Sequence, residues 1–212
     1  MSPSAAVVVL VGPPAAGKTT VRRRLVDAGL PPSQVVSLDD LRRAARSRAV
    51  AAGGTVRPLQ DYTLTALREA DHRQEQLLTA GLGYVADATH LRRRERVVHV
   101  RAAHAAGLPA LAVLLPDLPL HTLRTRDALR PAGERVPGDA LAAFAHRRSL
   151  LTADLLRGEG FTHVYDSLAE LDVVALTGRV HGRNVELGAW ASPDEVAQRP
   201  LGLRVTEREP GY

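Results

Sequence analysis

The sequence predicts an α/β fold in three layers, with a parallel β-sheet between two layers of helices. Short apolar runs rich in β-branched residues alternate with longer segments of helical periodicity along residues 5–176. Such alternation is typical of strand–helix–strand units and a parallel sheet. The first run is apolar at every position, as a strand buried on both faces of a sheet should be. A chain of 212 residues is long enough for one such domain with a substantial core.

The predicted strands are short, and most are apolar throughout. They are Ala5–Val11, Val35–Ser37, Tyr84–Ala86, Ala110–Leu115 and Thr162–Tyr165. The predicted helices are Lys18–Ala28, Asp39–Ala52, Tyr62–Ala80, Leu91–Ala106, Leu118–Leu129, Asp139–Arg157 and Leu168–Leu176. Stop signals support the first three, because Gly29-Leu30-Pro31-Pro32, Gly53-Gly54 and Gly81 follow them directly.

One domain is expected over residues 1–176, with a lid at about residues 118–138. From Thr177 onward the periodic pattern is lost. We therefore interpret residues 177–212 as a C-terminal extension of unknown role. It holds the single tryptophan, Trp190, and one candidate strand at Leu203–Thr206.

Composition excludes several classes of chemistry and location. The chain has no cysteine, which excludes disulfides, thiolate catalysis and cysteine zinc sites. No apolar run approaches the roughly 18 residues of a membrane span, and no basic segment precedes an apolar one at the N-terminus. A cytoplasmic protein without a membrane partner is expected.

Positive charge is concentrated in the first part of the chain. Residues 1–150 carry 22 basic and 13 acidic side chains, whereas residues 151–212 carry 6 and 10. This asymmetry suits a polyanionic ligand, although an arginine-rich coding bias explains it equally well. Lys18 is the single lysine among 28 basic residues, so one compact ammonium is retained at one place.

A phosphate-binding motif surrounds that lysine. Gly12-Pro-Pro-Ala-Ala-Gly17-Lys18-Thr19 matches the P-loop pattern G-x-x-x-x-G-K-[ST], between a predicted strand and a predicted helix. Its backbone N–H groups should cradle phosphates at a helix N-terminus. Lys18 should reach the β- and γ-phosphates and act in catalysis, while Thr19 should bind Mg²⁺. The expected ATP-binding residues are Gly12, Ala15, Ala16, Gly17, Lys18, Thr19 and Thr20.

The type of nucleotide-binding protein can be narrowed. Guanine-specific switch proteins read the base with an Asn-Lys-x-Asp motif, and no lysine besides Lys18 exists to form one. A large remodelling ATPase is disfavoured because no separate helical domain fits after the last predicted strand. A small ATP-dependent kinase remains.

Two carboxylates follow predicted strands at the expected ligand-binding edge of the sheet. Asp39, after the strand ending at Ser37, can orient an acceptor hydroxyl and accept its proton. Arg42, one helical turn later, can hold an acceptor phosphate. Its neighbour Asp40 is interpreted as a first-turn acid that complements the helix dipole. Asp87 could hold Mg²⁺ waters, anchor Arg42, or simply cap a turn.

The order of these segments resembles the polynucleotide 5′-kinase group of P-loop phosphotransferases. The matching segments are GPPAAGKT, SLDDLR, VADATH and an arginine-bearing lid, within residues 5–176. That group is often labelled AAA-family ATPase and is related to zeta-toxin-like kinases. The resemblance implies an adenylate-kinase-like core, Asp39 as general base and Arg42 on the acceptor 3′-phosphate. The family's D-A-T-N segment ends here in His90, whose role stays open.

The lid match is Arg126-Asp-Ala-Leu-Arg130, followed by Arg135-Val-Pro137. Arg126 and Arg130 are four residues apart, so both can face the nucleotide from one side of a helix. There they would neutralise charge on the transferred phosphoryl group. A solvated basic helix face is the alternative. Asp127 stands where the family usually has Asn.

Three hypotheses follow. The first is a kinase acting on the 5′-hydroxyl end of RNA or DNA, with ATP and Mg²⁺ as cofactors. The second is a kinase of similar core that phosphorylates a small hydroxylated molecule, and the third is a nucleotide-binding module with little transfer activity. Only seven aromatic residues are present, so nucleic acid could be held only at its end rather than on a base-stacking platform.

Overall fold

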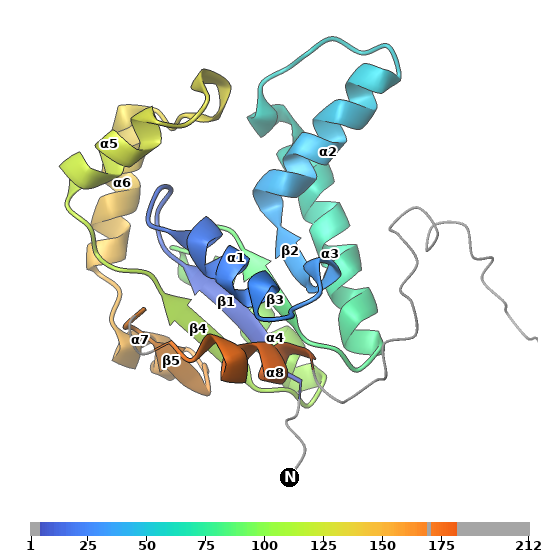
Figure 1. Cartoon of the computed structure of the whole chain (residues 1–212), viewed down its shortest axis with the longest axis vertical. Helices are drawn as coiled ribbons and strands as arrows, with labels where there is room; N and C mark the ends of the chain where they lie inside the picture. The colour runs from blue at the N-terminus through green and yellow to red at the C-terminus, as the bar shows by residue number, and fades with distance from the viewer. Residues whose placement is uncertain (1–4, 169–170, 182–212) are drawn as a thin grey trace, which may run out of the picture.

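In the computed structural model (Figure 1), residues 5–168 and 171–181 are described. They form a five-stranded sheet in the order β2-β3-β1-β4-β5, and every neighbouring pair of strands is parallel. The strands are β1 (Val7–Val11), β2 (Val35–Ser37), β3 (Tyr84–Asp87), β4 (Ala110–Leu114) and β5 (His163–Tyr165). The predicted α/β fold with a parallel sheet is confirmed.

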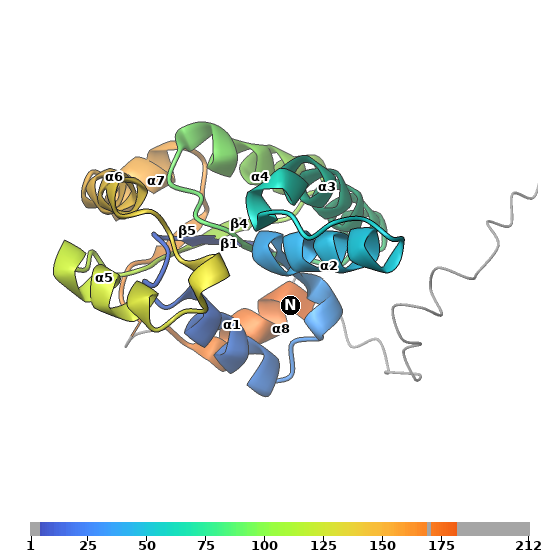
Figure 2. The same cartoon turned by 90° about the horizontal axis from the view of Figure 1, so that it is seen from above.

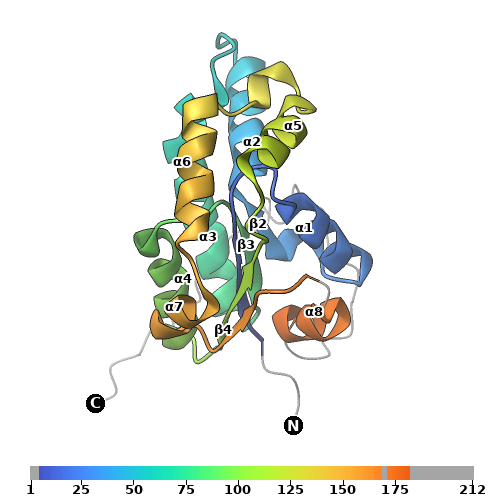
Figure 3. The same ribbon diagram turned by 90° about the vertical axis from the view of Figure 1, so that its left-hand side faces the viewer.

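Helices cover both faces of this sheet (Figure 3). One face carries α1 (Lys18–Asp27) and α8 (Val173–His181), and the other carries α3 (Thr63–Thr79), α4 (Arg93–Ala105) and α7 (Ala153–Gly158). Because side chains alternate across a strand, β1 contributes to both cores: Val7, Val9 and Val11 pack on the α3–α4 side, and Val8 and Leu10 on the α1–α8 side.

Two helical pairs rise beyond the carboxyl ends of the strands (Figures 1 and 2). One pair is α2 (Leu38–Ala51) with α3, and the other is α5 (Leu120–Ala128) with α6 (Gly138–Ser149). The phosphate loop leaves β1 between them. Short 3₁₀ turns at Pro32–Gln34, Leu59–Tyr62 and Ala132–Glu134 add local structure that the sequence did not predict.

The predicted single helix Asp139–Arg157 is wrong, because the chain forms α6 and α7 with a break between them. The Thr152 hydroxyl accepts the N–H of Leu155 and caps the new helix. The buried guanidinium of Arg148 donates to the carbonyls of Leu115, at 2.6 Å, and Leu151, at 3.0 Å. These bonds hold the break against the end of β4.

The last helix is displaced from its predicted position, Leu168–Leu176. It runs from Val173 to His181, and Asp172 accepts the N–H of Ala175 at 2.9 Å at its start. Leu176 and Val180 are completely buried against α1 and the sheet. The predicted boundary at residue 176 therefore falls inside α8, and the expectations for Trp190 and Leu203–Thr206 lie outside the described residues.

Across residues 5–168 and 171–181, no helix is long and apolar enough to cross a membrane.

Candidate active site

The phosphate loop bends tightly between β1 and α1, and its small residues permit the bend. A Cβ on Gly12 would lie 2.6 Å from the Leu115 Cβ, closer than real Cβ atoms approach. Gly17 has a φ of 107°, which L side chains rarely adopt. Ala15 is left-handed as well, with a φ of 62°. The loop leads directly into the N-terminus of α1, and a helix N-terminus favours anions.

Lys18 is the first residue of α1, and its side chain turns back onto this loop. Its Nζ donates to the carbonyls of Gly12 at 3.0 Å and Pro13 at 2.7 Å. Burial lowers the pKa of Lys18 to about 8, and the nearby carboxylates of Asp87 and Asp39 oppose that shift. Phosphate oxygens arriving here would give the ammonium the charged partners that its surroundings supply only in part.

A cavity of about 290 Å³ opens in front of Lys18, between the two helical pairs. Most of the predicted site residues meet there. Its lining comprises Pro14, Ala15, Gly17, Lys18, Thr19, Arg22, Ser37, Asp39, Asp40, Arg43, Asp87, Arg126 and Arg130. Within the described part of the chain, the predicted residues Gly12, Ala16, Thr20 and Arg42 do not line it.

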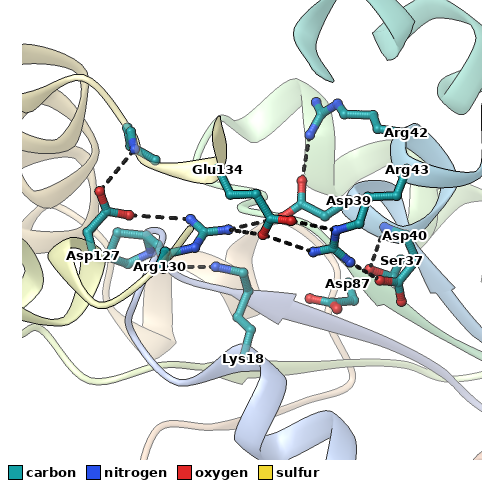
Figure 4. A network of polar contacts seen from close by, with 12 residues as sticks. Lys18, Ser37, Asp39, Asp40, Arg42, Arg43, Asp87, Asp127, Arg130 and Glu134 are labelled. Atoms are coloured by element: carbon teal, nitrogen blue, oxygen red, sulfur yellow. Dashed lines mark hydrogen bonds and ion pairs between the residues drawn. The ribbon is translucent and has the colours of Figure 1, made fainter. Parts of the chain in front are cut away.

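Asp39 reaches this cavity from the first turn of α2 (Figure 4). Its Oδ1 accepts from Arg42 Nη1 at 2.7 Å, and its Oδ2 lies 4.0 Å from Arg130 Nη2. Arg42 also donates to the Thr63 hydroxyl at 3.2 Å. Asp39 is more than half exposed, so its Oδ2 is available to an incoming hydroxyl.

Asp87 is the last residue of β3, lines the same cavity as Asp39 and is almost fully buried. Burial raises its pKa, whereas the cations of Lys18 and Arg22 and a hydrogen bond from Ser37 favour the ionised form. The expectation that Asp87 anchors Arg42 is wrong, because its ion-pair partner is Arg22, at 3.3 Å. Arg42 lies on the far side of Asp39.

Three charged residues of the site were missed from the sequence: Arg22, Arg43 and Glu134. Arg22 bridges Asp87 and Asp40, and lies 2.5 Å from the Asp40 carboxylate. Arg43 binds Asp40 at 2.6 Å and Glu134 of the lid at 3.1 Å. Asp40 is thus more than the predicted first-turn acid, although its N–H does meet the Ser37 hydroxyl. The four-residue spacing from Lys18 to Arg22 was a usable signal, because it places both side chains on one helix face.

The lid arginines approach from the other side of the cavity. Arg126 donates to the Ala15 carbonyl at 3.4 Å. The prediction that both arginines share a helix face is wrong in detail, because α5 ends at Ala128 and Arg130 lies in the turn beyond it. Buried Asp127 orients that turn by accepting from Arg130 at 3.3 Å and from the N–H of Val136 at 2.9 Å. Both lid arginines still line the cavity.

The Thr19 hydroxyl and the Asp87 carboxylate, the two groups predicted to bind Mg²⁺, both line the cavity. Among the described residues, no group of three or more His, Asp or Glu side chains could hold a metal by itself. Mg²⁺ commonly binds through one or two protein oxygens together with substrate phosphates and water. The buried carboxylate of Asp87, on the same cavity as exposed Thr19, fits that mode.

Comparison with solved structures finds several similar chains. A provisionally named kinase from Chloroflexus aurantiacus J-10-fl is 19% identical with a TM-score of 0.51, covering 82% of this chain and 95% of that one. A gluconokinase from Sinorhizobium meliloti 1021 is 22% identical with a TM-score of 0.46, covering 83% and 92%. A shikimate kinase from Acinetobacter baumannii, solved with shikimate, is 15% identical with a TM-score of 0.45, covering 84% and 92%. The first supports a P-loop kinase-like fold, and the lower scores of the other two carry no inference about the acceptor.

Sequence comparison gives the family. No curated protein matches the chain. A family model described as an AAA domain matches residues 7–151, which include the phosphate loop, Asp39, Asp87 and both lid arginines. Because this match spans more than half of the chain, the protein belongs to that AAA-domain family, and its described part has a P-loop kinase-like fold.

Proposed function

We propose that the protein is an ATP-dependent kinase that phosphorylates a hydroxyl group of a small molecule, with Asp39 as general base. One observation carries this proposal. The phosphate-loop residues Lys18 and Thr19 line the same cavity as the half-exposed carboxylate of Asp39. Phosphoryl transfer needs such a carboxylate to position the acceptor and take its proton.

The residues divide the reaction between them. The phosphate loop and Lys18 would hold the phosphates of ATP, and Arg126 and Arg130 would neutralise charge on the transferred group. Asp39 would take the hydroxyl proton as the acceptor oxygen bonds to the γ-phosphorus and ADP leaves. Mg²⁺, held by Thr19 and Asp87 when bound, would supply further charge neutralisation at the phosphates.

The charge balance of the acceptor side supports a small, weakly charged acceptor. Arg42 is paired with Asp39, and Arg43 with both Asp40 and Glu134. The Glu134 contact also holds the lid against α2. The 3′-phosphate of a nucleic-acid end would have to displace these pairs to reach Arg42 or Arg43. The polynucleotide reading is therefore the second candidate, resting on Arg42.

A transfer panel from labelled ATP tests the acceptor class. The wild-type protein is offered small polyols, sugars and hydroxylated acids in one arm, and 5′-hydroxyl oligonucleotides in the other. We expect label on a small molecule, lost in Lys18→Met, and an acceptor KM that changes little with ionic strength. Label on oligonucleotides alone, with a steep salt dependence, would contradict the proposed acceptor. ATP binding without transfer in either arm would identify a binding module instead.

A further inference from the structure

Three polar side chains form an unbroken hydrogen-bonded chain in the core behind the phosphate loop. The Tyr84 hydroxyl of β3 lies 3.0 Å from Nδ1 of His99 on α4. Nε2 of His99 lies 3.2 Å from Nε2 of His90. Nδ1 of His90 lies 2.9 Å from the main-chain carbonyl of Leu10 in β1. All three side chains are buried.

The chemistry of these atoms allows one direction of donation. The Leu10 carbonyl can only accept, so Nδ1 of His90 carries a proton. Burial lowers the pKa of His90 to about 4 and that of His99 to about 3, so both rings are neutral near pH 7. His90 Nε2 is then an acceptor, His99 Nε2 must donate to it, and the Tyr84 hydroxyl must donate to His99 Nδ1.

The hydrogen-bonded series from Tyr84 to Leu10 ends where the phosphate loop begins. Leu10 is two residues before Gly12, whose N–H donates to the Thr89 carbonyl at 3.0 Å. Two hydrogen bonds therefore hold the end of β1. The Thr89 carbonyl accepts from the Gly12 N–H, and the His90 ring donates to the Leu10 carbonyl. Gly12 in turn supplies a carbonyl to Lys18. His90 has a left-handed φ of 45°, and the Arg96 guanidinium holds its carbonyl at 2.9 Å.

We propose that His90 is a positioning residue for the phosphate loop, and that His99 and Tyr84 fix the tautomer in which it donates to Leu10. The proposal rests on the proposed function in one respect, that this loop binds nucleotide phosphates. It assigns a role to the residue that ends the Asp87-Ala-Thr-His90 segment. Tyr84 and His99 act through His90 and touch no ligand.

Two substitutions at position 90 separate this role from simple packing. Asparagine tolerates left-handed backbone, and its amide can donate to Leu10 while being too short to reach His99. Leucine removes both bonds. His90→Asn and His90→Leu share the loss of the His99 bond. They differ in the bond to Leu10 and in how well each residue tolerates the left-handed φ.

The binding experiment measures the affinity of the full chain for ATP and the midpoint of thermal unfolding, for wild type and both variants. We expect both variants to unfold at lower temperature than wild type. His90→Asn should keep ATP affinity within about threefold, and His90→Leu should lose about tenfold or more, comparable to one lost hydrogen bond. If the two variants lose ATP affinity equally, the positioning role is refuted.

A spectroscopic measurement tests the direction of hydrogen-bond donation from Tyr84 to Leu10 independently of activity. Nitrogen-15 chemical shifts of the wild-type protein near pH 7 should show His90 protonated at Nδ1 and His99 at Nε2. The reverse tautomer at either ring would overturn the proposal. Neither ATP binding nor tautomer assignment requires an acceptor, so a failed transfer panel would refute the proposed function while leaving this inference testable.

Discussion

Asp39 and Asp40, in front of the phosphate loop, are held differently from the polar groups behind it. Behind the loop, His90, His99 and Arg96 are buried and joined by hydrogen bonds to neutral or fully paired partners. In front of it, Asp39 and Asp40 are about half exposed and are held by ion pairs. No buried side-chain N or O atom lacks a partner within the described residues.

This difference suits the two tasks of the site. An exposed ion pair contributes only about 0–1 kcal/mol, so a substrate can replace one partner at small cost. A buried polar group that loses its partner costs about 1–3 kcal/mol, and more when it is charged. The buried side can therefore fix the phosphate loop in one geometry, while the exposed side can rearrange around an acceptor.

The largest expected effect is destabilisation of the fold by acid, through the buried histidines His90 and His99 behind the phosphate loop. Neutral His90 and His99 bind protons in the unfolded chain below about pH 6.5, but in the folded chain only near pH 4 and pH 3. Stability should fall as pH drops from 6.5 toward 4.5, by about 2–3 kcal/mol for each histidine. Burial is the main cause of the lowered pKa of His90, and the nearby charges of Lys18 and Arg96 lower it further.

Chemical denaturation between pH 7 and 4.5 measures that fall. His90→Asn should reduce the slope of unfolding free energy against pH by about one proton, or about 1.4 kcal/mol per pH unit. His146→Asn, on the exposed face of α6, is the control and should keep the wild-type slope. An unchanged slope in His90→Asn would mean that His90 is not held neutral in the folded protein.

Breaking a buried ion pair should have the next largest effect. Arg96 and Glu159 meet at 2.6 Å with side chains that are 2% and 5% exposed, and Arg96→Met should cost about 3–5 kcal/mol of unfolding free energy. Arg157 and Asp154 also meet at 2.6 Å, but at 50% and 92% exposure. Arg157→Met should cost less than about 1 kcal/mol of unfolding free energy. If denaturation shows equal losses for the two variants, the buried pair is no more important to stability than the exposed one.

Arg22 tests whether the front ion pairs also position catalytic groups. Its guanidinium ties α1 to Asp40 on α2 and to Asp87 on β3. Arg22→Gln should lower kcat about tenfold, the effect of a modest misplacement, with ATP affinity nearly unchanged. Arg23→Gln, exposed on the same helix, should leave kcat unchanged. Steady-state kinetics in which both variants behave alike would deny Arg22 this role.

The smallest effect is expected at the lid. Glu134 pairs with Arg43 and lies 3.9 Å from Arg130, so Glu134→Gln should change the free energy of unfolding by less than about 1 kcal/mol. Glu69→Gln, which breaks an exposed pair on α3, is the matched control. A loss of several kcal/mol at position 134 would show that the lid is held as firmly as the buried side.

The sequence predicted those parts of the protein whose signals are local. The apolar run before Gly12 and the motif spacing locate β1, the phosphate loop and Lys18. Because parallel strands end at one edge, Asp39 and Asp87 were expected to meet there, and they line one cavity. Thr152, which caps α7, was a local signal for the break between α6 and α7 that the prediction missed.

The remaining features depend on contacts between distant parts of the chain. The Glu134–Arg43 pair joins residues 91 positions apart, and the Arg22–Asp87 pair joins residues 65 apart. His90 sits in a loop and has no apolar periodicity around it, so its burial follows only from the packing of α4 on the sheet. No local pattern records which arginine takes which carboxylate.

Comparison of Asp39→Asn with Asp40→Asn tests most directly whether Asp39 is the base of a kinase. The two carboxylates are adjacent and similarly exposed, at 56% and 48%. On the acceptor found in the transfer panel, Asp39→Asn should lower kcat by about 100-fold or more with ATP affinity within about twofold, and Asp40→Asn should stay within about tenfold of wild type. If Asp39→Asn retains kcat within a few fold of wild type, Asp39 is not the general base.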